Sequence, residues 1–280
     1  MRHLSPRDLA DALGVSESSL KRWVDSGKIV AFRTEGGHRR IALAEAVRFV
    51  RETHAPLARP ELLGLAEVAA AQRSMLTGSV RLFDFVSEGD VDGARGFLLA
   101  RYLAGATIAE LADGPIREAM EELGEIWRHD SRGIFIEHRA TDTCLQAIAH
   151  LRNMIDTPTN APLAIGAAPE DDPYILPAFL ATMVTTGAGL RTVNLGADTP
   201  LSALEQAVHH HRPRLVWMSA TAPINSARAR SIQRYFDSLD STTTVIVGGR
   251  HGRALAGRSR NVRYLDTLSE LSSVAAQLVA

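Results

Sequence analysis

The feature that most restricts the fold of this chain is a series of short apolar runs in its C-terminal part. These runs are Leu163–Ile165, Arg191–Leu195, Leu215–Met218 and Val245–Val247. Helix-length segments separate them, which is the pattern of βαβ units with parallel strands covered by helices on both faces. The pattern therefore predicts a doubly wound α/β domain over residues 158–280.

The first residues of the chain carry a different pattern, that of two short helices. Ser5 followed by Pro6 and an acidic residue is typical of a helix N-terminus, and Gly14 is placed to end that helix. Ser16 is the expected N-cap of a second helix that stops at Gly27. Two short helices joined by a tight glycine turn predict a helix-turn-helix.

A β-hairpin is expected directly after the second helix. Ile29–Phe32 and the stretch around Arg40–Ile41 are typical of short strands, and Gly36–Gly37 between them indicates the hairpin tip. We interpret this hairpin as a wing. It completes a winged helix-turn-helix domain at residues 1–51.

The middle of the chain is predicted to be helical. Residues 52–61 contain two prolines and no periodic pattern, which indicates a linker. From residue 62 to residue 157 the helical period resumes with three breaks, and we expect a four-helix bundle there.

Composition restricts the class of protein. A chain of 280 residues with 45% hydrophobic and 22% charged residues is long enough for several domains. The net charge is −1, so a DNA contact must come from a local basic patch; residues 1–51 carry ten Lys and Arg against six Asp and Glu. One cysteine, Cys144, in a helical pattern is expected to be a small buried side chain, and it favours a reducing cytoplasm. The sequence shows neither a signal peptide nor an apolar run of membrane-spanning length.

The basic N-terminal domain is expected to bind double-stranded DNA. A recognition helix places exposed side chains near its N-terminus against base edges, while a wing contacts phosphate. The expected DNA-binding residues are Ser18, Ser19, Lys21 and Arg22 on the helix and Arg33, His38, Arg39 and Arg40 on the wing.

The N-terminal stretch resembles the MerR-type regulators. The segment LSPRDLADALGVSESSLKRWVDSGKI followed by TEGGHRRI is similar to their winged helix-turn-helix motif over nearly its whole length. The resemblance implies a sequence-specific DNA-binding protein that acts as a homo-oligomer, a dimer or tetramer, on repeated half-sites.

The whole chain resembles the CarH and LitR class of cobalamin-dependent, light-sensing repressors in its order of domains. That class joins a winged helix-turn-helix, a four-helix bundle and a flavodoxin-like cobalamin-binding domain. Its bundle signature W-x9-E-H is matched by Trp127, Glu137 and His138, which the resemblance places over the upper face of the corrin. The resemblance also assigns the nucleotide tail of cobalamin to small residues at strand ends, which here are Ser219, Thr221, Gly248 and Gly249.

One position departs from that family. The loop after the first strand reads E-x-H in the family, and its His supplies an imidazole to cobalt; here the corresponding residues are Glu170, Asp171 and Asp172. A carboxylate is a harder ligand than an imidazole, so Asp172 is not carried over as a metal ligand. Three alternatives follow: cobalamin binds without a protein ligand, the pocket takes a bilin or other tetrapyrrole, or it takes nothing.

An enzyme is the competing class, because related α/β domains serve cobalamin-dependent mutases and methyltransferases. The sequence shows no nucleophile elbow, phosphate loop or metal-spaced Cys and His set. The three consecutive residues His209–His211 precede Arg212 and Pro213 and are expected to form a solvated helix end rather than a metal site. A regulator is therefore favoured over an enzyme.

Overall fold

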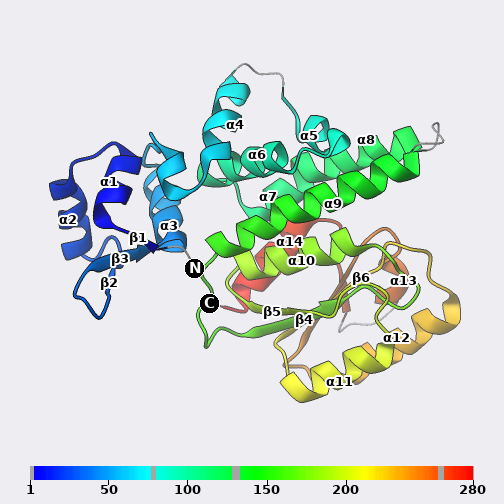
Figure 1. The fold of residues 1–280 in the computed structure, drawn as a ribbon. Coiled ribbons are helices and arrows are strands. Elements are labelled where there is room, and N and C mark those ends of the chain that lie inside the picture. Colours follow the sequence, from blue (N-terminus) through cyan, green and yellow to red (C-terminus); the bar gives the residue numbers. More distant parts are fainter. Residues whose placement is uncertain (1–2, 77–79, 128–132, 258–261, 280) are drawn as a thin grey trace. The chain divides into compact units, whose positions relative to one another are not determined.

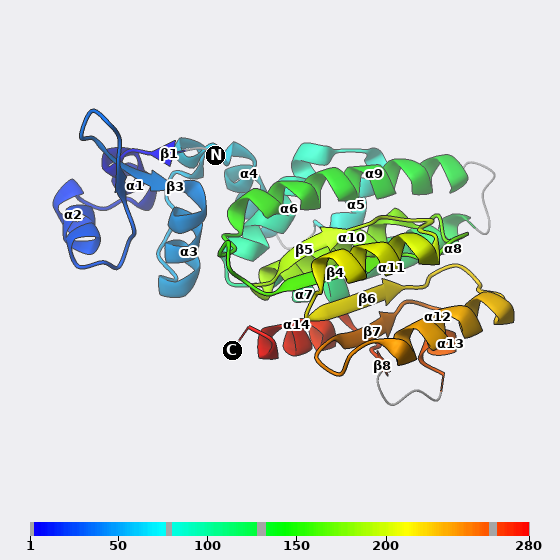
Figure 2. The same cartoon turned by 90° about the horizontal axis from the view of Figure 1, so that it is seen from below.

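The computed structural model describes residues 3–76, 80–127, 133–257 and 262–279. The chain divides into two compact units. We call Met1–Thr107 with Gly114–Asp156 the helical unit, and Ile108–Asp113 with Thr157–Ala280 the α/β unit. Figures 1 and 2 show the elements of both.

The helical unit begins with a helix-turn-helix and a small antiparallel sheet. The strands of this sheet follow the order β1-β3-β2. Its elements are β1 (His3–Leu4), α1 (Pro6–Leu13), α2 (Glu17–Asp25), β2 (Phe32–Arg33), β3 (Arg39–Ala42) and α3 (Leu43–Thr53). The helix-turn-helix prediction is confirmed, including the caps at Ser5 and Ser16 and the left-handed Gly14 with φ 67°.

Three details of this region differ from the prediction. β2 has only two residues, and Ile29–Ala31 lie outside it. β1 was not predicted, because two residues give no periodic signal. α3 was not predicted either, and it runs to Thr53, inside the segment expected to be a linker.

The rest of the helical unit is a set of packed helices. They are α4 (Ala66–Leu76), α5 (Leu82–Glu88), α6 (Val91–Leu103), α8 (Arg117–Trp127) and α9 (Gly133–Leu151), with 3₁₀ turns at Pro60–Leu63 and Arg152–Met154. α6 packs against α4 and α9, and α9 also packs against α5 and α8. Cys144 is buried in α9, as expected, and burial raises the pKa of its thiol to about 12.

The α/β unit contains a five-stranded parallel sheet with the order β5-β4-β6-β7-β8. Its strands are β4 (Leu163–Ala167), β5 (Arg191–Asn194), β6 (Leu215–Ser219), β7 (Thr244–Gly248) and β8 (Val262–Tyr264). The first four match the predicted runs, and β8 was not predicted because it is three residues long. This is the flavodoxin-like order, in which the direction of winding reverses between β4 and β6.

Helices cover both faces of this sheet (Figure 1). They are α10 (Ile175–Gly187), α11 (Leu201–His211), α12 (Ser226–Ser238), α13 (Arg253–Ala256) and α14 (Leu268–Gln277). Side chains of α11, α12 and α13 form one buried cluster with alternate residues of the strands, among them Val216 and Met218. α10 and α14 pack together on the opposite face.

A short segment from the middle of the chain completes the α/β unit. α7 (Ile108–Leu111) packs against α10 and α14 although helices of the other unit precede and follow it in sequence. The Asp113 carboxylate accepts hydrogen bonds from the amides of Leu268 (3.0 Å) and Ser269 (2.8 Å) at the start of α14. The sequence placed residues 108–113 in the helical bundle, because local helical periodicity carries no information about such distant partners.

Candidate nucleic-acid interface and strand-end crevice

The N-terminal half of α2 presents polar side chains to solvent. Leu20 is fully buried and anchors the helix from its inner side. Ser18, Lys21 and Arg22 are exposed, and Ser19 is half-buried. The structure thus brings the four predicted helix residues onto the first turns of one exposed helix.

The serines at the start of α2 form a small hydrogen-bonded group. The Ser16 hydroxyl accepts from the Ser19 amide (3.2 Å) and lies 2.8 Å from the Ser18 hydroxyl. The Arg22 guanidinium donates to the Ser19 hydroxyl (3.3 Å). Ser19 is therefore part of the helix cap, whereas Ser18 keeps an exposed side chain.

The β2–β3 hairpin supplies the remaining predicted DNA-binding residues. Arg33 and His38 are exposed, and Arg39 and Arg40 are half-buried. The turn is closed by the Thr34 amide donating to the His38 carbonyl (2.9 Å). Arg39 forms an ion pair with Asp25 at the end of α2 (2.9 Å), so the hairpin is connected to α2.

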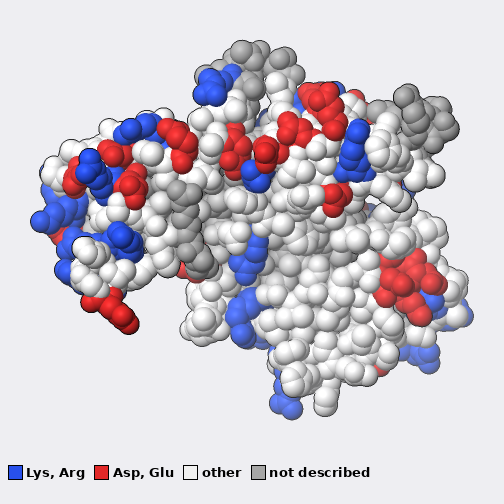
Figure 3. All heavy atoms as spheres, viewed as in Figure 1, with Lys and Arg blue, Asp and Glu red and all other residues white. Residues whose placement is uncertain are grey.

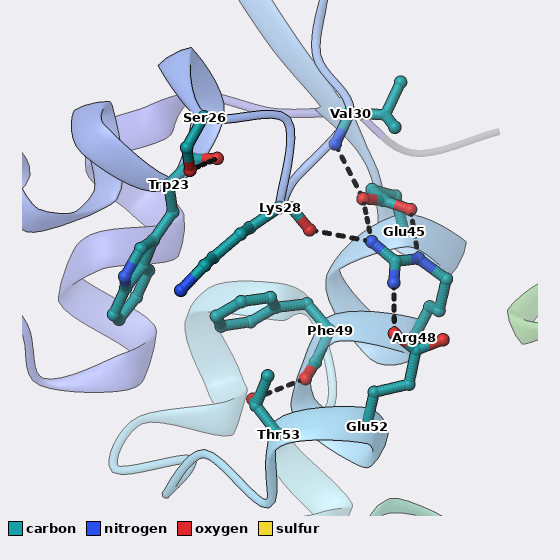
Figure 4. Close-up of polar contacts among 9 residues, drawn as sticks. All are labelled: Trp23, Ser26, Lys28, Val30, Glu45, Arg48, Phe49, Glu52 and Thr53. Carbon is teal, nitrogen blue, oxygen red and sulfur yellow. Dashed lines mark hydrogen bonds and ion pairs between the residues drawn. The ribbon is translucent and has the colours of Figure 1, made fainter.

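An ion pair within α3 connects this helix to the segment between α2 and the hairpin (Figure 4). Glu45 accepts from the Val30 amide (2.7 Å) and from Arg48, and Arg48 also donates to the Lys28 carbonyl (2.9 Å). Burial raises the pKa of Glu45, but the hydrogen bonds from Arg48 and Val30 outweigh it, and the pKa lies below its usual value. These hydrogen bonds were not predicted, because α3 was not predicted.

Aromatic packing supports the same junction. Trp23 of α2 lies against Phe49 of α3 with ring centroids 5.0 Å apart. Figure 3 shows Lys and Arg side chains gathered over the part of this face formed by α2 and the β2–β3 hairpin, with acidic side chains among them. The junction therefore places a rigid, locally basic surface at the N-terminal end of the helical unit.

The three residues predicted to cover a corrin lie on two helices of the helical unit. Trp127 is the last residue of α8, and its side chain lies outside the described part of the structure. Glu137 and His138 are near the start of α9. The His138 Nε2 atom lies 3.6 Å from the Glu137 Oε2 atom, and the His138 side chain is largely exposed. Two apolar neighbours, Ile134 and Phe135, are also exposed, at 56% and 62%.

The other predicted cofactor residues lie at the carboxyl ends of the strands in the α/β unit. In open parallel sheets, ligands bind in the crevice where winding reverses, here between β4 and β6. Asp172, in the loop after β4, is 1% exposed. The Oδ2 atom of Asp172 accepts hydrogen bonds from the amides of Thr221 (2.5 Å) and Ala222 (3.0 Å), which lie in the loop after β6.

Further contacts complete the environment of Asp172. Its Oδ1 atom accepts from the Tyr174 amide (3.2 Å), and its carbonyl accepts from the Asp198 amide (2.9 Å) in the loop after β5. Asp172 thus joins three strand-end loops. Its carboxylate is turned onto backbone amides, an arrangement that does not fit the role of an axial metal ligand.

The two acidic residues before Asp172 have a separate partner. Arg228 of α12 lies 2.6 Å from Asp171 and 3.3 Å from Glu170. The hydrogen bond with Asp171 raises the pKa of Arg228. The repulsion expected among three consecutive carboxylates is therefore relieved, since two face an arginine and the third faces amides.

The small residues predicted to hold a nucleotide tail lie at the ends of β6 and β7. Ser219 is buried at the end of β6, and its partner in the sheet is Gly248. Thr221 donates its amide to Asp172. Gly249 has a φ of 88°, and a β-carbon there would come within 2.5 Å of the Ala220 carbonyl oxygen. Glycine at 249 therefore allows the chain after β7 to pack against the chain after β6.

Among the residues that the structure describes, no group of three His, Cys, Asp or Glu side chains is placed to hold a metal ion. His209, His210 and His211 are exposed and form the last turn of α11, as predicted. No helix in the described part of the chain is both long and apolar enough to cross a membrane.

The chain is similar to known proteins both in its N-terminal region and along most of its length. Residues 4–54 match the family of helix-turn-helix domains. The HTH-type transcriptional repressor CarA of Myxococcus xanthus is 25% identical over 286 residues, which cover 96% of this chain and 94% of the repressor. The monomethylamine corrinoid protein of Methanosarcina barkeri is similar in structure, with a TM-score of 0.54 and 18% identity over 70% of this chain and 95% of that protein. The chain therefore carries an N-terminal helix-turn-helix domain, and most of it has the fold of a corrinoid protein.

Proposed function

We propose that this protein is a transcriptional regulator that binds double-stranded DNA through a winged helix-turn-helix. The observation that carries the proposal is the exposed N-terminal half of α2 lying beside a basic hairpin that is ion-paired to it. The similarity to the repressor CarA along almost the whole chain supports a regulatory role.

The proposed contacts follow from exposure. Ser18, Lys21 and Arg22 are exposed on α2 and face base edges in the major groove. Arg33 and His38 on the hairpin, with the half-buried Arg40, contact phosphate. Ser19 and Arg39 orient these elements through their contacts with Arg22 and Asp25.

The protein is proposed to act as a homo-oligomer, a dimer or tetramer, in the cytoplasm. One small helix-turn-helix makes too few base contacts for high specificity, so two copies on repeated half-sites are needed. In the helical unit, α4, α6, α8 and α9 are the proposed members of the predicted four-helix bundle, with α5 as a short helix packed on α9.

The α/β unit is proposed to serve as a regulatory module of the cobalamin-binding type rather than as part of an enzyme. The corrinoid-protein fold supports the type of module, and the helix-turn-helix and the repressor relative support regulation. Asp172 is not proposed as a cobalt ligand, because its carboxylate is held by backbone amides. The alternatives for the module are cobalamin without a protein ligand, a bilin or other tetrapyrrole, or no ligand, and binding measurements with corrinoids and biliverdin distinguish them.

The test of DNA binding is selection from a random duplex library, followed by fluorescence anisotropy on the enriched sequence. Lys21→Ala and Arg22→Ala should each change the enriched sequence at particular base pairs and weaken binding to the original site by about 1–3 kcal/mol per lost base contact.

Arg73→Ala provides the matched control, because Arg73 is an exposed cation on α4 outside residues 4–54. It should leave both the enriched sequence and the affinity unchanged. If the library yields no enriched sequence, or if Lys21→Ala and Arg22→Ala bind the original site as the unaltered protein does, the proposed function is wrong.

A further inference from the structure

A tryptophan occupies the sheet face beside the crevice between β4 and β6. Trp217 is in the middle of β6 and is 2% exposed. Its neighbours Val216 and Met218 belong to the cluster under α11 and α12. Because successive side chains of a strand point to opposite faces, Trp217 lies on the face that α10 and α14 cover. Ser219 is two residues further along β6 and lies on that same face.

The Trp217 ring lies directly on the neighbouring strand. Gly166 of β4 is the register partner of Trp217, and a β-carbon at Gly166 would overlap the indole ring. The position of the indole ring therefore requires glycine at 166, because no side chain fits between β4 and the ring. The space between the sheet and α10, which small side chains at these two positions would leave open, is filled by the indole.

The indole nitrogen supports a space-filling role. Trp217 Nε1 is buried and has no hydrogen-bond partner among the described residues. Buried tryptophans usually find a partner for this donor. Leaving it unpaired costs free energy, so the position is occupied for the volume of the ring and not for a polar contact within the protein.

The mouth of the crevice is closed by Asp172. The amides of Thr221 and Ala222, at the carboxyl end of β6, are donors of the kind that hold anionic or polar groups of ligands at such a crevice. Here both donate to the buried Asp172 carboxylate. The Asp172 carboxylate therefore occupies the amide donors, and the Trp217 indole fills the space beside them.

We infer that the α/β unit keeps the fold of a corrinoid protein while Trp217 and Asp172 close its strand-end crevice from within, so that no nucleotide tail of a corrinoid enters it. This inference rests on the proposed function in one respect, which is that the protein is a regulator. A regulator whose strand-end crevice is filled by its own side chains binds DNA without a corrinoid.

The test compares two corrinoids that differ in the tail. Full-length protein is mixed in the dark with hydroxocobalamin or with cobinamide, which lacks the nucleotide, and passed over a sizing column. The expected result is no preference for cobalamin: any absorbance that elutes with the protein is equal for the two corrinoids. Retention of cobalamin at least tenfold tighter than cobinamide would overturn the inference. Biliverdin in a third sample tests the alternative ligand, and stoichiometric retention of it by the unaltered protein would also contradict closure.

Variants locate the effect. Trp217→Ala should open the groove and create a preference for cobalamin over cobinamide. Phe236→Ala is the matched control, because Phe236 is a buried aromatic of α12 on the opposite face of the sheet. It should leave the two corrinoids equivalent. Should either variant fail to fold, as judged by circular dichroism, the measurement on the unaltered protein still decides the question.

A DNA measurement separates this inference from the proposed function. Affinity for the enriched duplex should be the same within twofold with and without hydroxocobalamin. A protein that binds no duplex under either condition would contradict the proposed function, while the corrinoid comparison would still test the closed crevice.

Discussion

At the residue scale, Asp25 neutralises one of the cations of the hairpin. Its ion pair with Arg39, at 2.9 Å, holds a guanidinium that the sequence assigned to phosphate. We predict that Asp25→Asn releases Arg39, which raises affinity for any duplex and steepens the dependence on salt by up to about one unit of log–log slope, whereas Arg39→Ala does neither.

The measurement is anisotropy on a nonspecific duplex at several salt concentrations. Arg33→Ala, on the exposed part of the same hairpin, should make the slope shallower by about one unit if it contacts phosphate. Equal slopes for the unaltered protein, Asp25→Asn and Arg33→Ala would remove the hairpin from the interface.

The lowered pKa of Glu45 gives the N-terminal domain a specific response to acid. The folded state favours the charged form of Glu45, so the unfolded state binds a proton more readily. The charged Glu45 therefore stabilises the folded state above the usual glutamate pKa of about 4.3. This stabilisation is lost as the pH falls through the lower pKa of the folded state. We predict that Glu45→Gln lowers the free energy of unfolding near neutral pH by about 1–2 kcal/mol and flattens its loss in acid.

Urea unfolding at a series of pH values measures this effect. Glu35→Gln, at the exposed hairpin tip, removes one negative charge without touching the Arg48 contacts and should keep the acid dependence of the unaltered protein. A Glu45→Gln curve parallel to that of the unaltered protein would contradict the assignment.

At the scale of elements, the strand-end loops of the α/β unit are held by one buried carboxylate. The Asp172 carboxylate accepts hydrogen bonds from three backbone amides in two loops, and the Asp172 carbonyl accepts one from an amide in a third loop. Removal of the carboxylate leaves buried amides without acceptors. We predict that Asp172→Ala lowers the free energy of unfolding by about 3 kcal/mol, measured by thermal or urea unfolding.

Glu170→Ala is the control for this prediction. Glu170 is exposed and forms a surface ion pair with Arg228, which is worth at most about 1 kcal/mol. Equal stability of the Asp172→Ala and Glu170→Ala proteins would show that the buried carboxylate does not hold the loops together.

The elements that were predicted correctly are those whose signals are local. Ser5, Gly14 and Ser16 bracket α1 and the start of α2, since a cap acts within four residues of its own position. The elements that were missed, β1, α3 and β8, are short or are not bracketed by such caps. α3 has no side-chain hydrogen bond at its N-cap Ala42, and it is stabilised by packing of Val47, Phe49 and Val50 in the core.

At the scale of the whole molecule, the chain leaves the helical unit for α7 and then returns. Asp113 follows α7 and holds this segment on the α/β unit. Its carboxylate accepts hydrogen bonds from the first two amides of α14, which are 155 and 156 residues away in sequence. We predict that Asp113→Ala loosens the start of α14 by about 1–2 kcal/mol, seen as faster hydrogen exchange at Leu268 and Ser269.

Asp240→Ala, in the exposed turn before β7, serves as the comparison for a lost carboxylate elsewhere in the same unit. Exchange at Leu268 and Ser269 should remain slow in that protein. If exchange there is equally slow in Asp113→Ala, α7 is held by its apolar contacts with α10 and α14 alone.

The sequence by itself determined the order of the parts: a capped helix-turn-helix, a helical region and a parallel α/β sheet. These follow from periodicity and capping, which are properties of neighbouring residues. Tertiary structure decided what the candidate sites hold. Asp172 looked like a residue in the place of a metal ligand, and only the approach of the β6 loop shows its oxygens taken by backbone amides. Trp217 belongs to one of the predicted apolar runs, and only the pairing of β6 with β4 shows that its ring lies over Gly166, because the partner of a strand residue is not a property of its neighbours in sequence.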